Sequence, residues 1–232
     1  MNSNDNSNKK TKKAKHKNPF RYFIYDFIKW SRALSVLIWQ RPLSLYESQT
    51  AKKHVKNGAV VIANHVHIFD PIALLCTFWY RRLHFLIQQE SFEKPFPRWF
   101  FTHVGGVPVD RENFNMNTYR AAIDLLQEGK LLCIFPEGHI NFDDPSTIKA
   151  FKSGSVLMAI KAGVPIVPTY LVPRKKWYSR AITVIGEPID INKLCGGQSS
   201  IRAIEEITKI LQEKELKLKE VYESWKKTKS SK

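Results

Sequence analysis

The chain has 232 residues, 43% of them hydrophobic, which fits one globular domain with a sizeable core and argues against a disordered chain. Its 37 Lys and Arg outnumber its 21 Asp and Glu, and the formal net charge is +16. This charge indicates an anionic partner (nucleic acid, an acidic membrane surface or a phosphorylated substrate) without choosing among them. The three separated cysteines and the polar, lysine-rich start predict a reducing intracellular compartment and no secretory signal peptide.

The first 42 residues divide into a tail and a helix. Residues 1–17 carry six lysines and one aspartate, which predicts a disordered basic tail, either solubilising or weakly attracted to anionic lipid. Residues 18–42 predict an amphipathic helix that begins at Asn18-Pro19 and ends before Pro42. Its narrow basic stripe beside a wide apolar, aromatic face favours a helix that docks in a membrane interface. Packing on the protein's own core is the alternative.

Residues 43–232 alternate between strand and helix patterns. Predicted strands cover 58–63, 83–88, 107–111, 131–135, 164–172 and 181–185, and predicted helices cover 71–80, 117–128, 153–162 and 200–225. Residues 93–103 are expected to form a short helical or irregular segment. This alternation predicts a single layered α/β domain with a mostly parallel or mixed sheet flanked by helices. The sequence has no glycine-rich phosphate loop and no G-x-S-x-G elbow, so dehydrogenases, NTPases and serine hydrolases lose their usual support.

A histidine and a carboxylate lie on the connection between the first of these strands and its helix. His65 follows the apolar run 58–63, and Asp70-Pro71 predicts a helix start with Asp70 at the N-cap. Ligands of open α/β sheets bind at this edge, where an aspartate that reaches the ring would make His65 a general base. Alternatively, Asp70 is only a helix cap and His65 a loop residue, or His65 and His67 bind a metal, although the chain has no zinc-like ligand spacing.

Four segments line up in order along the chain. They are Asn64-His65-x4-Asp70, Gly106-Val-Pro-Val-Asp-Arg111, Phe135-Pro-Glu137-Gly138 and, after Phe151-Lys152-x-Gly154, Val164-Pro-Ile-Val-Pro168. Together they resemble the 1-acylglycerol-3-phosphate acyltransferase (lysophosphatidic acid acyltransferase) family. The resemblance runs over residues 58–188, and the basic, aromatic helix at 18–42 also looks like the family's membrane-docking segment.

The resemblance implies a fatty acyl transfer from coenzyme A or acyl carrier protein to the free hydroxyl of a lysophospholipid, with lysophosphatidic acid as the expected acceptor. It implies His65 as the general base and Asp70 as the residue that orients it. Arg111 would grip the acceptor's phosphate, since a guanidinium matches phosphate oxygens. Substrate binding is further expected of Asn64, Glu137, Gly138, Lys152 and Pro168. No metal or cofactor is implied beyond the acyl donor.

The third segment departs from the family pattern. After Glu137-Gly138 the family usually continues with Thr-Arg-Ser, whereas this chain has His139-Ile140-Asn141. The missing arginine removes one expected phosphate ligand. Lys149 or Lys152 could substitute as a point charge, or the acceptor could carry a different head group. His139 is alternatively a loop residue without a role.

Three other functions compete with this hypothesis. The same chemistry could serve another lysophospholipid, and an inactive membrane scaffold is opposed by the intact His65 and Asp70. The net charge also allows a basic nucleic-acid-binding protein, although the chain has no zinc-finger spacing, RNP-like motif or basic zipper. The leading hypothesis places the protein at the cytoplasmic face of a membrane with anionic lipid.

Overall fold

The fold is organised around a mostly parallel sheet of seven strands. The computed structural model describes Phe27 and residues 42–53, 55–103, 105–109, 116–174, 176, 179–196 and 200–231. In chain order the elements are β1 (Leu43–Tyr46), β2 (Ala59–Ala63), α2 (Asp70–Thr77), β3 (Leu83–Gln88), η2 (Gln89–Phe92), α3 (Pro95–His103), β4 (Gly106–Val109), α4 (Met116–Gln127), β5 (Leu131–Ile134), α5 (Gly154–Ala162), β6 (Ile166–Leu171), β7 (Ile182–Ile185), α6 (Ile191–Leu194) and α7 (Ile201–Ser230).

The strand order is β1-β7-β6-β2-β5-β3-β4. Strands β6, β2, β5, β3 and β4 run parallel to one another, while β7 pairs antiparallel with β6 and parallel with β1. The carboxyl ends of the five parallel strands therefore meet at one edge. The residues that follow β2, β5 and β6 are brought together there, although they are about 40 to 110 positions apart in the sequence.

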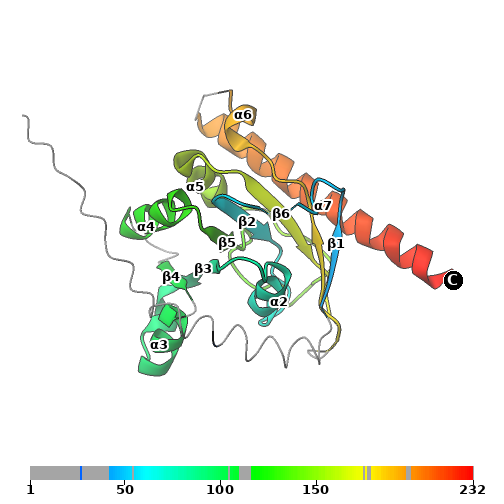
Figure 1. Ribbon diagram of the computed structural model, residues 1–232, viewed down its shortest axis with the longest axis horizontal. Coiled ribbons are helices and arrows are strands. Elements are labelled where there is room, and N and C mark those ends of the chain that lie inside the picture. The colour runs from blue at the N-terminus through cyan, green and yellow to red at the C-terminus, as the bar shows by residue number, and fades with distance from the viewer. Residues whose placement is uncertain are drawn as a thin grey trace, which may run out of the picture.

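Helices cover both faces of this sheet. On one face, Ala59, Val61 and Ala63 of β2 pack in a cluster with Ala73, Leu74 and Phe78 from α2 and the residue after it. On the other face, Val60 and Ile62 share a cluster with residues of α4, α5 and α7. Successive strand residues point to opposite faces, so the continuous apolar run of β2 is buried on both sides. In Figure 1, α7 is the long orange-to-red helix that ends at the C-terminus.

Most predicted elements are confirmed. The ends of the strands lie within two or three residues of their predicted positions, and the ends of the helices within a few more. The mixed α/β sheet is also confirmed. Strand β1 was not predicted from the sequence. It has only four residues, all of them partly exposed, and its strand conformation depends on pairing with β7, in which Leu43 lies opposite Ile182. That pairing joins segments about 140 residues apart, which a local pattern does not reveal.

Two predictions lie outside the described residues. One is the interfacial helix at 18–42, of which the structure describes only Phe27 and Pro42, and with it the tail at 1–17. The other is Arg111, in the segment 110–115 that follows β4. Among the described helices, none combines the length and the apolar character needed to cross a membrane.

Candidate functional site

The carboxyl edge of the parallel strands gathers the polar side chains of the site. His65 follows β2, Glu137 follows β5 and Arg174 follows β6, and Asp70 begins α2 beside them. Asp70 is 1% exposed and Glu137 is 2% exposed, so both carboxylates are removed from water. Buried carboxylates require specific partners, and their contacts define the geometry of the site.

His65 and Asp70 form a directed pair. His65 Nδ1 lies 3.1 Å from Asp70 Oδ2, and the His65 side chain is 13% exposed while that of Asp70 is 2% exposed. The imidazole also stacks on Phe135, with ring centroids 4.0 Å apart and planes inclined by 15°. When Nδ1–H donates to the carboxylate, the basic lone pair is on Nε2. The arrangement therefore fixes the tautomer and the orientation of His65, as a general base requires.

The prediction that Asp70 caps its helix is wrong. Helix α2 includes Asp70 as its first residue, and its N-cap is Phe69, which makes no side-chain capping bond. Asp70 Oδ2 instead accepts hydrogen bonds from the backbone N–H groups of Val66 and His67, at 2.8 Å and 2.7 Å. The carboxylate turns back toward the preceding loop because three donors converge there. Asp70 thus orders the loop that carries His65.

Arg174 is a residue of the site that the sequence analysis missed. Its guanidinium NH2 lies 3.6 Å from Asp70 Oδ1, and its side chain is 4% exposed. Burial lowers the pKa of Arg174, and the charge of Asp70 opposes this shift. One Asp70 oxygen therefore serves the His65 loop and the other faces a buried cation. A signal was available, since Arg174 follows the predicted strand 164–172 by two residues, just as His65 follows the strand 58–63 by two.

Glu137 holds the backbone of the His65 loop. Its Oε1 accepts from His65 N at 3.0 Å, and its Oε2 accepts from Lys149 N at 3.2 Å. Burial raises the pKa of Glu137, and these two backbone N–H donors lower it in part. On the other side of His65, its carbonyl oxygen accepts from Asn141 N at 2.7 Å. The loop after β5 therefore forms hydrogen bonds with both the backbone N–H and the backbone C=O of His65.

Asn64 and Pro168 lie just behind this loop. The Asn64 side chain is fully buried and exchanges two hydrogen bonds with the backbone of Leu171, at 2.9 Å through Nδ2 and 2.6 Å through Oδ1. Pro168 is buried in β6, opposite Ile62 of β2. These contacts tie the end of β2 to β6. Whether Asn64 and Pro168 also bind substrate stays a prediction.

Basic side chains surround the turn at Gly138. This glycine has φ +80°, and a Cβ there would lie 3.1 Å from Lys152 Nζ, so the ammonium group of Lys152 lies over the turn. Next to it, His139 Nε2 lies 3.4 Å from Lys149 Nζ. Lys149 also faces the exposed Asp143 at 3.7 Å. The turn therefore presents a group of cationic and polar donors whose position relative to His65 is set by Glu137 and Asn141.

The predicted alternative of a metal pair at His65 and His67 gains no third ligand. His67 Nδ1 accepts from the Phe69 backbone N–H at 3.1 Å, and His65 Nδ1 faces Asp70. Burial and the charge of Arg174 hold the pKa of His67 below its ordinary value. In the part of the chain that the structure describes, no three His, Cys, Asp or Glu side chains group in a way that could hold a metal ion.

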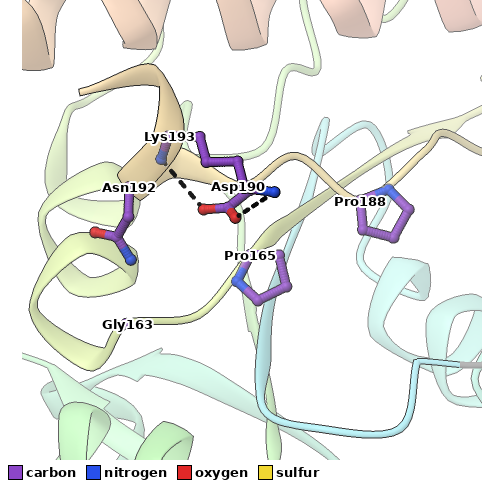
Figure 2. A pocket seen from close by; sticks show the side chains of 6 residues that line it. All are labelled: Gly163, Pro165, Pro188, Asp190, Asn192 and Lys193. Carbon is purple, nitrogen blue, oxygen red and sulfur yellow. Dashed lines mark hydrogen bonds and ion pairs between the residues drawn. The ribbon is translucent and has the colours of Figure 1, made fainter. Parts of the chain in front are cut away.

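A hollow at the opposite edge of the sheet is unrelated to this site. Figure 2 shows its lining residues, which lie before β6 and around α6: Gly163, Pro165, Pro188, Asp190, Asn192 and Lys193. Its charged groups satisfy one another, because Asp190 accepts from Lys193 N at 3.3 Å and faces Lys193 Nζ at 3.6 Å. The candidate chemistry therefore belongs to the carboxyl edge.

The arrangement at the carboxyl edge suits proton abstraction from a hydroxyl group. A histidine with a fixed tautomer can take the proton through Nε2, and the Asp70 carboxylate stabilises the imidazolium that results. The cationic turn beside it suits an anionic substrate group. Together these features suit the activation of a hydroxyl group on a substrate that carries an anionic group.

Comparisons with known proteins agree with this chemistry. A family model described as Acyltransferase matches residues 44–172, more than half of the chain. A 1-acyl-sn-glycerol-3-phosphate acyltransferase of Borreliella burgdorferi is 24% identical over 159 residues, which cover 68% of this chain and 62% of that protein. A Bacillus subtilis protein of the same name is 29% identical over 138 residues, covering 57% of this chain and 67% of the relative. The chain thus spans about two thirds of these relatives or slightly less.

A solved structure shares the fold. The crystal structure of a 1-acyl-sn-glycerophosphate (LPA) acyltransferase from Thermotoga maritima aligns with a TM-score of 0.60 over 86% of this chain and 81% of that chain. The sequence identity is 23%. The likeness extends over most of the described domain and places the seven-stranded sheet in a known architecture.

Proposed function

Because the chain belongs to this acyltransferase family, we propose that it transfers a fatty acyl group from an acyl thioester to the free hydroxyl of lysophosphatidic acid, which yields phosphatidic acid. The observation that carries the proposal is the buried Asp70 carboxylate 3.1 Å from His65 Nδ1 at the carboxyl edge of the sheet. Family membership also favours a lipid over nucleic acid as the anionic partner of this basic chain.

The proposed reaction needs no covalent acyl-enzyme. His65 Nε2 takes the proton of the acceptor hydroxyl as the oxygen attacks the thioester carbonyl carbon. The tetrahedral intermediate then breaks its C–S bond, and the departing thiolate takes the proton from His65. Asp70 stabilises the transient imidazolium and holds Nε2 toward the acceptor, while the buried Arg174 fixes the second oxygen of Asp70. A thioester is already activated, so no serine nucleophile is required.

Glu137 acts in this proposal by positioning rather than by binding the acceptor directly. Its two oxygens hold the backbone N–H groups of His65 and Lys149, which sets the distance between the base and the cationic turn. The positive φ of Gly138 and the close approach of Lys152 shape that turn. Asn64 and Pro168 lie behind the His65 loop and support it. Arg111, beyond the end of β4, is proposed as a ligand of the acceptor's phosphate.

We assign the remaining phosphate contacts to Lys149 and Lys152, as substitutes for the arginine that the family usually has after Glu-Gly, and to His139, the first residue of the segment where the family usually has Thr-Arg-Ser. Lys149 and His139 present their nitrogens 3.4 Å apart, and Lys152 lies over Gly138 next to them. Two ammonium groups and an imidazole can donate hydrogen bonds to several oxygens of one phosphate. A lysophospholipid whose phosphate carries a further head group is the second candidate acceptor, since the arginine that the family usually has in the Thr-Arg-Ser segment is missing.

The partners in this proposal are an acyl thioester of coenzyme A or acyl carrier protein, a lysophospholipid and an anionic membrane surface at the cytoplasmic face. The net charge of +16 and the predicted interfacial helix at residues 18–42 support membrane association. Co-sedimentation with anionic vesicles, comparing the full chain with one lacking residues 1–42, tests this part. Equal binding of the two would remove the helix from the proposal.

An acceptor panel tests the head group. Lysophosphatidic acid, a lysophosphatidylcholine and a monoacylglycerol are compared in detergent with one acyl thioester. We expect turnover to be highest with lysophosphatidic acid. Lys149→Met should raise KM for it by about 10- to 100-fold with kcat nearly unchanged, because one charge-assisted contact is worth about 1.5–3 kcal/mol.

The matched control for Lys149→Met is Lys161→Met, which changes an exposed lysine on α5. It should leave KM unchanged. If Lys149→Met raised KM equally for the monoacylglycerol, which has no phosphate, then Lys149 would have only a structural role. Higher turnover with the lysophosphatidylcholine would move the assignment to the second candidate acceptor.

A further inference from the structure

The long helix α7 contacts the loop that carries Lys149. Gln212 Nε2 donates a hydrogen bond to the backbone carbonyl oxygen of Lys149 at 3.3 Å. Lys219 Nζ donates to the backbone carbonyl oxygen of Ser146 at 2.7 Å. Gln212 and Lys219 are seven positions apart, which places them on the same side of the helix, about two turns from each other. The two donors therefore hold the segment 146–149 along one side of α7.

An apolar contact adds to these two hydrogen bonds. Ile148, which lies between Ser146 and Lys149 in the sequence, packs against a cluster that contains Leu218 of α7. Tyr222, one turn further along α7, packs against the same cluster. The side chain of Ile148 is thus a third attachment of the segment 146–149, so the segment cannot turn freely about its hydrogen bonds.

The backbone of Lys149 is held from two sides. Its N–H donates to Glu137 Oε2 at 3.2 Å, and Glu137 Oε1 accepts the backbone N–H of His65. Its C=O accepts from Gln212 of α7. The first contact connects Lys149 to the catalytic base, and the second connects it to the helix that covers the sheet. The position of the Lys149 ammonium group relative to His65 therefore depends on Gln212 as well as on Glu137.

We propose that Gln212 is a positioning residue for acceptor binding, because it fixes the backbone from which Lys149 extends toward the acceptor's phosphate. The inference rests on the proposed function, in which Lys149 is a ligand of that phosphate. Lys219 supports the same segment, but its charge would also attract a phosphate from a distance. Gln212 carries no charge, so its effect on phosphate affinity reports the position of Lys149.

The kinetic test compares Gln212→Met with the matched control Gln127→Met, which makes the same replacement at an exposed position of α4. Gln212→Met should raise KM for lysophosphatidic acid by about 3- to 10-fold with kcat nearly unchanged, because the net effect of one hydrogen bond is of this size. KM for a monoacylglycerol, which has no phosphate, should stay the same, and Gln127→Met should match the wild type with both acceptors. An equal rise for both acceptors would overturn the proposal, as would an unchanged KM for lysophosphatidic acid in folded Gln212→Met.

A double variant tests whether Gln212 acts through Lys149. Lys149→Met removes the ammonium group, so the addition of Gln212→Met should raise KM for lysophosphatidic acid no further. This non-additivity is a readout that a merely structural role of Gln212 would not produce. If the two replacements raised KM independently, so that their fold-changes multiplied, the positioning role would be overturned.

Amide hydrogen exchange separates failure of this inference from failure of the proposed function, because it requires no substrate. In Gln212→Met the Lys149 amide should exchange faster than in the wild type, since the C=O of the same residue has lost its hydrogen bond to α7. The Asn141 amide, which bonds to the His65 carbonyl, should keep its wild-type rate. An unchanged rate at Lys149 would overturn the positioning role even if lysophosphatidic acid were the acceptor. Faster exchange at Lys149 without any transfer to lysophosphatidic acid would support the positioning of Lys149 and contradict the proposed function.

Discussion

Replacing His65 with alanine is expected to lower kcat for acyl transfer by about 10²–10⁴-fold, the range in which a positioned general base contributes. In the proposed reaction the imidazole takes the hydroxyl proton. Two neighbours orient it, Asp70 at 3.1 Å and Phe135 with its ring centroid at 4.0 Å. KM for the acceptor should change little. The measurement is steady-state kinetics, with the melting temperature recorded to verify folding.

The chain supplies a matched control for this variant. His67→Ala removes a second imidazole from the same loop, one whose Nδ1 accepts from the Phe69 N–H and makes no contact with Asp70 through its ring. Since partly exposed side chains outside a special network usually contribute little, kcat should change by about twofold or less. If folded His65→Ala retained wild-type kcat, His65 would have no part in the proton transfer.

The second large effect is expected for Asp70→Asn, with kcat reduced by about 10²–10⁴-fold because the imidazolium loses its counter-charge and its fixed tautomer. The carboxylate has two oxygens that accept hydrogen bonds, whereas the amide has only one. Its oxygen would be needed by the Val66 and His67 N–H groups, which leaves its NH2 group toward the Arg174 guanidinium. Breaking a buried ion pair in this way should also reduce stability by about 3–5 kcal/mol.

A double variant separates the two consequences of Asp70→Asn. Adding Arg174→Gln removes the buried positive charge that faces the new amide, so thermal stability should recover in part. The loss of kcat should remain, because no carboxylate is restored next to His65. Recovery of kcat together with stability would mean that Asp70 acts only by holding the fold, and its role in proton transfer would be abandoned.

Much of this site could be anticipated because its residues follow strands whose patterns are local. The run Gly58–Ala63 predicted a buried strand, and the strand before Glu137 was equally clear, so His65 and Glu137 could be expected at one edge. The parallel order of β2 and β5 then brings them into contact. The backbone N–H of His65 accordingly bonds to Glu137, across 72 positions in the sequence.

The features that were not predicted depend on which partners the side chains contact in the folded chain. Asp70-Pro71 has the pattern of a helix cap, yet three donors in the preceding loop attract the carboxylate away from its helix. Arg174 follows a strand like the other site residues, and its partner could not be inferred without the pairing of β6 with β2. Gln212 has the pattern of an ordinary polar residue on a helix, and only the folded chain shows its hydrogen bond to the Lys149 backbone.

The most direct test of the proposed transfer measures thiol release and phosphatidic acid together, with oleoyl-coenzyme A as donor and the full 232-residue chain in detergent, in the presence and absence of lysophosphatidic acid. Direct transfer predicts one thiol per phosphatidic acid molecule and almost no thiol without the acceptor. Thiol release that does not depend on any acceptor would identify a hydrolase and contradict the account.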